Sequence, residues 1–442
     1  MKKLAFLLVV FWSQYTGAQC ITSFDIGRQH SMFIMSNGAM YAVGYNGFGQ
    51  LGRGNNFDAS VLVQVGNQYD WATVAGGGNH TAAVKIDGTL WTWGRNVSGE
   101  LGLGGGGNRN TPTQVGTENN WAKVYGGGFN TFAIKQDGTL WATGLNFYGQ
   151  LGDGTTTGRS SFVQVGTDTD WAHISAGPNH TLALKTNGTL WAWGATYDTG
   201  DPDNYGPNPV GTDTWLSMAA GANHTMAVRS DGTLWAWGSN SYGQFGNGTT
   251  ASLGLPVQIG TDTNWVEVGA GFDHSVGLKS DGTLWAWGDG GYGQLGQGSS
   301  TDQYAPVQVG TDTDWTKIIV DEYHNKALKA NGEVWAWGNN IYYQLGVGMG
   351  TGFPKKVTCP ALALAQPEAF AFNVYPNPVR DVLYFDNPSG AVCDVLVSDV
   401  SGKQIIQQTT SGAVIVSALS PGFYVLQLTV SGKRQQVKFI KE

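Results

Sequence analysis

The octapeptide DGTLWAWG occupies residues 231–238 and recurs without change at residues 281–288. Close variants stand at 87–94, 137–144 and 187–194, and looser copies stand at 37–44 (NGAMYAVG) and 331–338 (NGEVWAWG). The second residue of every copy is glycine, at positions 38, 88, 138, 188, 232, 282 and 332, so the copies lie 50 residues apart except for one interval of 44. A fixed period of this length is typical of a propeller or a solenoid.

One repeat unit, residues 71–116, shows the elements that surround the octapeptide. WATVAG, HTAAVKI and TLWTWG each predict a β-strand, and PTQVG predicts a short outer strand. Asp87-Gly88 is a two-residue hairpin turn, because both central residues of such a turn favour positive φ. No segment has helical periodicity, which excludes a solenoid of helices. Four strands per unit and seven units predict an all-β fold, a seven-bladed β-propeller.

The tryptophans are explained by the same units. Trp91 and Trp93 share one face of their strand, whereas Leu90 and Thr92 share the other, because side chains alternate along a strand. Six tryptophans open first strands, eleven lie in octapeptides, and the last is Trp12. We therefore interpret the tryptophans as packing between blades rather than as a platform for stacking sugars.

The composition limits the partners of the chain. The 442 residues carry a net charge of −8, and only 13% of them are charged, which argues against nucleic acid and against anionic lipid. Lys2 and Lys3 precede an apolar run at 4–12, and Thr16 and Ala18 suit the −3 and −1 places of a cleavage site. These features predict a signal peptide at 1–18, and we expect no transmembrane segment in the mature chain.

The unit W-x-x-V-x-x-G-x-x-H-T-x-A-[LV]-K-x-[DN]-G-T-L-W-x-W-G-x-N-x-x-G-Q-L-G resembles the repeat of the regulator of chromosome condensation family. The resemblance covers about residues 21–358 and implies a seven-bladed propeller, which we place at 19–360. Members of that family include an exchange factor for a small GTPase and a bacterial inhibitor of β-lactamases. A secreted protein would not meet a cytosolic GTPase, so we do not transfer exchange activity to this chain.

Two of the three cysteines lie at the ends of the repeat region. When the units are aligned on their histidine and outer-strand proline, Cys20 takes the place of Asn120 and Cys359 takes the place of Thr117. Those places are three residues apart in the blade connections, so a Cys20–Cys359 disulfide would replace the covalent link that the two chain ends lack. Export makes oxidation of the pair plausible. Cys393 lies in an apolar run and is interpreted as a lone buried thiol.

The repeat stops after Pro360, and residues 361–372 form a linker. Residues 373–442 predict a small β-sandwich that resembles the C-terminal sorting domain of type IX secretion cargo. The residues that carry the resemblance are Pro376, Asn377, Pro378, Asp399, Gly402, Lys403, Leu419, Gly422, Tyr424 and the terminal lysines. The resemblance implies contact with the type IX machinery and transport across the outer membrane of a Gram-negative cell, followed by release or attachment to the cell surface.

Neither a cofactor nor a metal is predicted. Six of the seven histidines share one repeat position in six different blades, whereas metal ligands must converge on one ion. GFGQLG and GYGQLG match the spacing of a dinucleotide motif but lack the helix that the motif needs. Blade four has a shorter loop that groups Asp198, Asp201, Asp203 and Asn204. These residues are a weak candidate for calcium, and a polar turn is the alternative.

Blade seven also departs from the repeat, at other positions than blade four. The other blades have glycine at one place after the first strand, whereas blade seven has Asp321, followed by Glu322 and Tyr323. We interpret glycine at that place as allowing a backbone shape that is costly for other residues. Tyr342-Tyr343 also replaces the usual Tyr-Gly. These five residues are the candidate ligand-binding site, and drift in a terminal blade is the alternative.

The sequence shows no catalytic constellation, so we expect a non-enzymatic binding module for an extracellular protein or a surface glycan. We also expect a monomer. One alternative is an enzyme that degrades an extracellular polymer, which would need carboxylates converging in one pocket. The other is a structural surface component that associates with itself. Fold alone does not decide among these functions.

Overall fold

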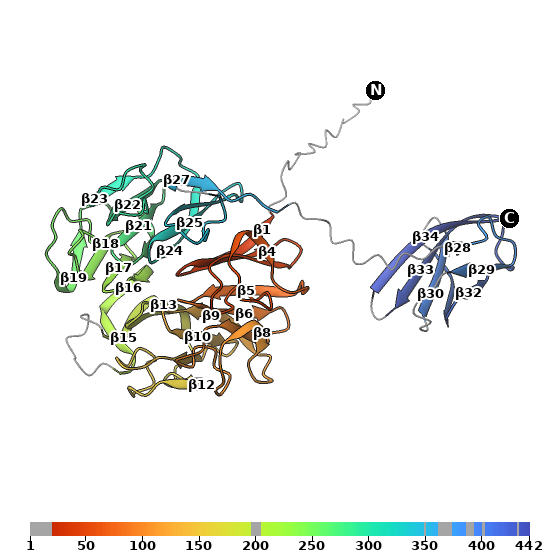
Figure 1. Ribbon diagram of the computed structural model, residues 1–442, viewed down its shortest axis with the longest axis horizontal. Helices are drawn as coiled ribbons and strands as arrows, with labels where there is room; N and C mark the ends of the chain where they lie inside the picture. The colour runs from red at the N-terminus through yellow and green to blue at the C-terminus, as the bar shows by residue number, and fades with distance from the viewer. Residues whose placement is uncertain are drawn as a thin grey trace, which may run out of the picture. The chain divides into compact units, whose positions relative to one another are not determined.

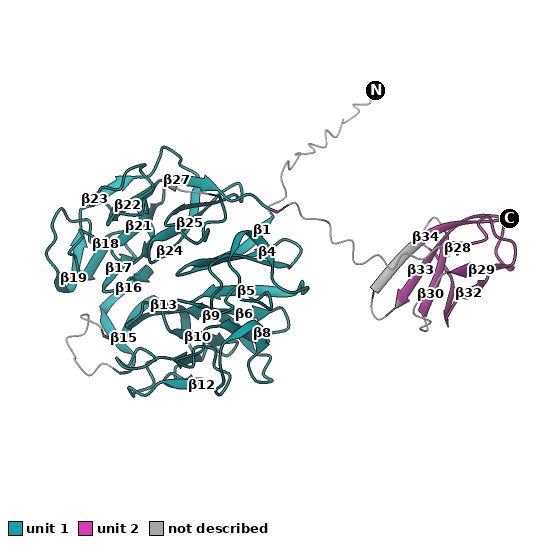
Figure 2. Cartoon of the chain, in the orientation of Figure 1, with its two compact units in different colours: residues 1–359 teal, residues 360–442 magenta. Residues whose placement is uncertain are grey.

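The computed structural model describes residues 20–195, 205–348, 351–360, 374–385, 393–399, 403–430 and 433–442. The chain divides into two compact units, residues 1–359 and 360–442 (Figure 2). No helix occurs in the described part of the chain. The predicted signal peptide, the linker, the calcium candidates Asp198, Asp201 and Asp203, and the sorting residue Gly402 lie outside the described residues.

The first unit consists of antiparallel sheets arranged in a ring (Figure 1). Three sheets have four consecutive strands: β1 (Ile21–Gly27), β2 (His30–Met35), β3 (Met40–Gly44) and β4 (Ala59–Gln64); β5 (Trp71–Gly76), β6 (His80–Lys85), β7 (Leu90–Gly94) and β8 (Arg109–Gln114); and β9 (Trp121–Gly126), β10 (Asn130–Lys135), β11 (Leu140–Gly144) and β12 (Arg159–Gln164). Two more such sheets are β20 (Trp265–Ala270), β21 (His274–Lys279), β22 (Leu284–Gly288) and β23 (Gln303–Gln308), and β24 (Trp315–Asp321), β25 (His324–Lys329), β26 (Val334–Gly338) and β27 (Thr351–Lys356).

The remaining strands of this unit form one seven-stranded sheet, β13 (Trp171–Ala176), β14 (His180–Lys185), β15 (Thr189–Gly194), β16 (Asn208–Ala220), β17 (His224–Arg229), β18 (Leu234–Gly238) and β19 (Leu253–Ile259). The strand β16 has 13 residues and pairs with β15 near one end and with β17 near the other. It therefore serves as the outer strand of blade four and the inner strand of blade five. This shared strand lies within the shortened 44-residue interval, and with it the sheets are consistent with seven blades.

Neighbouring blades pack large side chains against small ones. Trp93 is fully buried and lies in one cluster with Met32 and Ala42 of the preceding blade. Trp71 lies against Trp93 with ring centroids 5.8 Å apart. Trp91 is less buried, and the Lys85 ammonium lies 4.5 Å from its ring centroid. The predicted packing role of the octapeptide tryptophans thus matches the blade interfaces.

A hydrogen-bonded latch also joins successive blades. His30 Nε2 lies 2.9 Å from Thr81 Oγ1, and this hydroxyl donates to the Gln50 carbonyl at 2.9 Å. Because the hydroxyl proton is used in that bond, Nε2 of His30 must donate. Trp93 Nε1 donates to the same carbonyl at 2.8 Å. Equivalent contacts connect His80, His180, His224 and His274 to the next blade.

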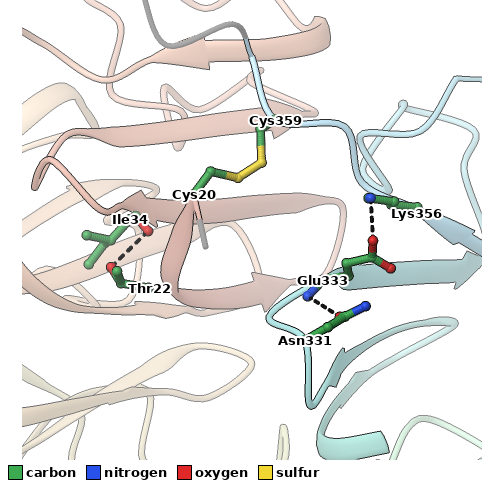
Figure 3. Close-up of a disulfide and its surroundings, with 7 residues drawn as sticks. All are labelled: Cys20, Thr22, Ile34, Asn331, Glu333, Lys356 and Cys359. Atoms are coloured by element: carbon green, nitrogen blue, oxygen red, sulfur yellow. Dashed lines mark hydrogen bonds and ion pairs between the residues drawn. A yellow bond between two sulfur atoms is a disulfide. The ribbon is translucent and has the colours of Figure 1, made fainter. Parts of the chain in front are cut away.

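The ring closes without exchanging strands between the two ends of the chain, because the first and last sheets each use consecutive strands. Cys20 and Cys359 form a disulfide with their Cα atoms 6.5 Å apart (Figure 3). The predicted ring closure is therefore present. Ser31 Oγ also donates to the Gln344 carbonyl at 2.6 Å across this junction.

The junction contains a buried charge that the sequence interpretation missed. Lys326 is fully buried on β25, and its Nζ donates to the Leu345 carbonyl at 3.1 Å. The ammonium also lies 5.2 Å from the ring centroid of Phe33 in blade one. Burial lowers the pKa of Lys326 to about 7.

The second unit has two sheets with a common apolar core. One contains β28 (Val374–Tyr375), β29 (Val382–Phe385) and β32 (Ala413–Ile415), and the other contains β30 (Cys393–Asp399), β31 (Gln404–Thr410), β33 (Gly422–Val430) and β34 (Lys433–Lys441). Cys393 is buried in this core and takes no part in the disulfide.

Residues of the predicted sorting motif hold the last strand of this unit in place. Asn377 Oδ1 accepts a hydrogen bond of 2.8 Å from the amide of Ile440 on β34. Tyr424 stacks on Phe439 of the same strand, with ring centroids 5.7 Å apart. Asp399 Oδ1 accepts a hydrogen bond from the Lys403 amide at 3.0 Å and so closes a turn.

Candidate functional site

The turn between the first and second strands of each blade lies on the same face of the propeller as the loop after the third strand. Backbone hydrogen bonds join them, such as that from Asn339 N to the Tyr323 carbonyl at 2.9 Å. Blades two, four and five have small or amide residues in this turn: Gly78-Asn79, Pro178-Asn179 and Ala222-Asn223. Blades six, seven and one have Phe272-Asp273, Glu322-Tyr323 and Arg28-Gln29 instead. Blade three has Gly128-Phe129, which adds an aromatic ring but no charge, so the charged residues of this turn occur only on three consecutive blades.

These departures contact one another across the ring junction. Arg28 Nε lies 2.6 Å from Glu322 Oε2. The Arg28 guanidinium also lies 5.7 Å from the ring centroid of Phe272, within the range of a cation–π interaction. Arg28 thus links blade six, blade seven and blade one on this face.

Aromatic rings continue the same surface. Tyr323 lies between Phe272, with centroids 5.2 Å apart, and Tyr292, with centroids 4.9 Å apart. Further along blade seven, Tyr342 lies 5.0 Å from Tyr45 of blade one. We call this surface the blade-seven patch and define it by Arg28, Tyr45, Phe272, Tyr292, Glu322, Tyr323, Tyr342 and Tyr343.

Tyr343 has an unusual backbone. Its φ is 64°, and no other residue except glycine has a positive φ in the described part of the chain. The equivalent glycines of two other blades, Gly49 and Gly293, have φ values of 85° and 73°. A left-handed conformation costs a residue with a side chain about 1–2 kcal/mol. The tyrosine is 37% exposed, so burial does little to offset that cost.

Asp321 ends β24, where it lines the axial cavity, and its φ is not positive. The interpretation that glycine serves backbone shape at this place is wrong, because the six equivalent glycines have no positive φ either. Space is the reason in blades one, two, five and six: a Cβ on Gly27, for example, would lie 2.3 Å from the His30 ring. Blade seven has Asp321 in place of this glycine, and His324 Nε2 has no hydrogen-bond partner among the described residues.

The inner strands enclose a cavity of about 370 Å³ on the propeller axis. Its lining includes Asp25, Glu267, Lys317 and Asp321. Asp25 accepts a hydrogen bond from the Gly76 amide at 3.2 Å, and Glu267 accepts one from the Ile318 amide at 3.1 Å. These carboxylates therefore cap the exposed inner edge of the next blade.

Burial dominates the electrostatics of these acids. It raises the pKa of Asp25 to about 6 and that of Glu267 to about 7. Burial also raises the pKa of Asp321 and of Glu322, and the charge of Asp321 raises the pKa of Glu322 further. In the described residues no group of three or more His, Cys, Asp and Glu side chains is arranged to hold a metal ion.

The sequence interpretation named Asp321, Glu322, Tyr323, Tyr342 and Tyr343. The structure brings Glu322 and Tyr323 together with three residues that the sequence interpretation missed, Arg28, Phe272 and Tyr292. Asp321 instead faces the axial cavity next to Asp25. A comparison of the turn dipeptides of all blades would have found Arg28 and Phe272.

Comparison with known protein families accounts for both units. The model of the regulator of chromosome condensation (RCC1) repeat matches residues 37–84, 87–134, 137–184, 231–278, 281–328 and 331–363. The chain belongs to the regulator of chromosome condensation (RCC1) repeat family. A second model of the RCC1 repeat matches residues 21–50, 71–100, 121–150, 171–198, 215–244 and 265–294. A secretion system C-terminal sorting domain matches residues 373–442.

Solved RCC1-type structures resemble the propeller. Prp20p from Saccharomyces cerevisiae is 21% identical with a TM-score of 0.65, over 75% of this chain and 88% of that chain. Yeast RCC1 (Prp20) bound to Kap60 is 19% identical with a TM-score of 0.65, over 82% and 92% of the two chains. Human WBSCR16 is 21% identical with a TM-score of 0.64, over 73% and 94%. Similarity at this level shows the fold alone. No curated protein matches the chain.

The sorting domain establishes where this RCC1-repeat protein acts. Type IX secretion exports the chain to the cell surface or the exterior of a Gram-negative bacterium, and the secretion machinery is a partner of residues 373–442. In the part of the chain that the structure describes, no helix has the length and apolar character needed to cross a membrane. The molecule is therefore an exported RCC1-repeat propeller.

Proposed function

We propose that this propeller is a binding module that recognises an extracellular protein or a surface glycan through the blade-seven patch. The observation that carries the proposal is the convergence of departures from the repeat on three consecutive blades. Blades one, six and seven carry charged residues in the turn between their first two strands, whereas blades two, three, four and five carry none there. Residues that depart from a repeat and also contact one another are best explained by a shared ligand.

Two further features support the proposal. Tyr343 keeps a left-handed backbone although glycine occupies that place in other blades, and strain of this kind gathers at functional sites. The patch lies on turns and loops that a rigid ring of sheets holds in place, which is the usual location of binding residues. The yeast relative Prp20p binds Gsp1p and histones, so an RCC1-type propeller can serve as a protein-binding surface.

Affinity capture tests the proposal. The secreted full-length chain is immobilised and exposed to envelope proteins and exported polysaccharide of the native culture, and bound material is identified by mass spectrometry. The test variant combines Glu322→Ala with Tyr343→Gly, which restore residues found in other blades, Ala222 and Gly293, and should leave folding intact. The control is Tyr148→Ala, at the position in blade three that is equivalent to Tyr292.

We expect an enriched partner that soluble chain displaces, that the control retains and that the double variant loses. Equal capture by the double variant would contradict a site in the blade-seven patch. Recovery of the chain itself alone would favour a self-associating surface component.

A further inference from the structure

At its blade-six end, the blade-seven patch adjoins two carboxylates. Asp273 precedes the repeat histidine, and Asp289 follows the octapeptide of the same blade. A backbone hydrogen bond of 2.8 Å from Asp289 N to the Asp273 carbonyl holds the two residues together. Blades two, four and five have asparagine in place of Asp273, and no other blade has an acid in place of Asp289. This pair is thus particular to blade six.

The described residues supply no cation to this pair. Asp273 accepts a hydrogen bond from the Gln244 amide group at 3.2 Å, and Asp289 accepts one from that of Gln294 at 2.8 Å. No Lys or Arg of the described residues forms an ion pair with either carboxylate. By contrast, Glu322 is paired with Arg28 at 2.6 Å. The blade-six end of the patch therefore has two half-buried negative charges with no cation in contact.

Aromatic rings stand beside these charges. Tyr323 is close enough to both acids for their charges to raise its pKa, after burial and the charge of Glu322. Tyr292 is 49% exposed, and its ring is inclined by 51° to that of Tyr323. With their centroids 4.9 Å apart, the two rings pack against each other and present one angled aromatic surface beside the carboxylates. Aromatic faces together with carboxylates are typical of sites for organic cations.

The patch already holds one cation in this manner. Arg28 contacts the Phe272 ring at 5.7 Å and the Glu322 carboxylate at 2.6 Å. Phe272 in turn lies against Tyr323, which stands between the two ends of the patch. The arginine end is therefore satisfied within the chain, whereas the blade-six end offers similar groups, a tyrosine ring and carboxylates, to a cation from outside.

We propose that Tyr292, Tyr323, Asp273 and Asp289 form a pocket for a lysine or arginine side chain of a partner protein. This inference rests on the proposed function and names the class of its ligand. A protein partner is favoured over a neutral glycan because only a cation compensates the two carboxylates. Cation–π attraction and charge-assisted hydrogen bonds would act together on such a side chain.

Binding of a defined probe tests the pocket. The probe is a biotinylated peptide of alternating Gly and Lys residues, compared with the same peptide after acetylation of its lysines and with neutral dextran. Biolayer interferometry at an ionic strength of about 0.15 M measures binding to the secreted full-length chain. The test variants are Asp273→Asn with Asp289→Asn, and separately Tyr292→Ala. Asparagine occupies both places in other blades, at Asn223 and Asn339, so the first variant should fold.

Matched controls separate the pocket from general attraction to an acidic protein. Asp281→Asn changes the charge in a hairpin turn of the opposite face, where blade four has Asn187. Tyr148→Ala removes a tyrosine with 52% exposure, close to the 49% of Tyr292. We expect about tenfold weaker binding of the lysine peptide to each test variant and unchanged binding to both controls.

Three outcomes would overturn the pocket: no binding of the lysine peptide, equal binding of the acetylated peptide, or equal weakening in the controls. The proposed function fails separately, when the Glu322→Ala and Tyr343→Gly variant captures native partners as well as the unchanged chain does. A third result would contradict the cation pocket alone. In that result the double variant loses capture, whereas neither added lysine peptide nor the Asp273→Asn with Asp289→Asn variant reduces it.

Discussion

Replacement of both Cys20 and Cys359 by serine should lower the melting temperature of the propeller by up to about 8 °C. The disulfide joins residues that are 339 positions apart, so it constrains a very large loop in the unfolded chain. The loop-entropy relation gives about 6 kcal/mol for a loop of this length at 25 °C. This value is an upper one, because residual structure in the unfolded chain reduces the entropy that the cross-link removes.

The conversion to temperature uses the size of the propeller. Unfolding entropy near the melting point is about 2.1 cal/mol/K for each residue, which gives about 0.7 kcal/mol/K for the closed loop. Dividing the stabilisation by this entropy yields the shift of about 8 °C. The measurement is differential scanning calorimetry of the secreted chain and of the double variant at equal concentration.

The third cysteine provides the control. Cys393 is buried in the second unit and lies outside the ring. Replacement of Cys393 by serine should leave the propeller transition in place and change only the transition of the second unit. A propeller shift below about 2 °C in the double variant would refute the entropy argument. It would mean that contacts such as Ser31 with Gln344 close the ring without help from the disulfide.

Three other perturbations test separate parts of the structure. Burial lowers the pKa of His80 from 6.5 to about 4, so this residue costs nothing above about pH 6.5 and destabilises the fold as pH falls below that value. When the pH falls from 7 to 5, the free energy of unfolding measured by urea denaturation should therefore decrease by about 2 kcal/mol less in His80→Asn than in the unchanged chain. An equal decrease in both proteins would contradict the lowered pKa of His80. Tyr343→Gly should raise the free energy of unfolding by about 0.5 kcal/mol because it relieves a left-handed tyrosine, and a lower melting temperature would argue against strain. Asn377→Ala removes the acceptor for the Ile440 amide and should reduce the share of chain in the medium, measured by immunoblot of cell fractions; undiminished export would show that this clip is dispensable.

The repetition in the sequence explains why the propeller could be predicted. Most blades place glycine, tryptophan and histidine at the same positions, so one interpretation of strand alternation applies to all seven units. The merged strand β16 was not predicted, because the shorter interval reveals a deletion without revealing how the remaining residues pair. The role of Gly27 was misjudged for a related reason. A need for space against a histidine ring and a need for positive φ both select glycine, and the letter alone does not distinguish them.

Only part of the candidate site could be predicted from the sequence, and the reason is physical. Asp321 and Tyr343 stand out when blade seven is compared with its sister blades. The contact between Arg28 and Glu322 is hidden, because the two residues lie at opposite ends of the repeat region and meet only when the ring closes. Burial of Lys326 was equally hidden, since a lysine in a strand is usually exposed.

The ring junction explains why departures could accumulate in blade seven. At the other interfaces with a repeat histidine, that histidine hydrogen-bonds to a side chain of the next blade. The partner is the residue that follows the next blade's histidine, or that follows the asparagine in its place. His274, for example, lies 2.8 Å from Asn325. At the junction His324 Nε2 lacks that bond, whereas Lys326 adds hydrogen bonds to backbone carbonyls and a cation–π contact with Phe33. The disulfide adds a covalent link at this interface, so the interface does not depend on the histidine hydrogen bond. Side chains there are consequently less constrained by repeat packing, and a ligand-binding surface can occupy the junction without weakening the rest of the ring.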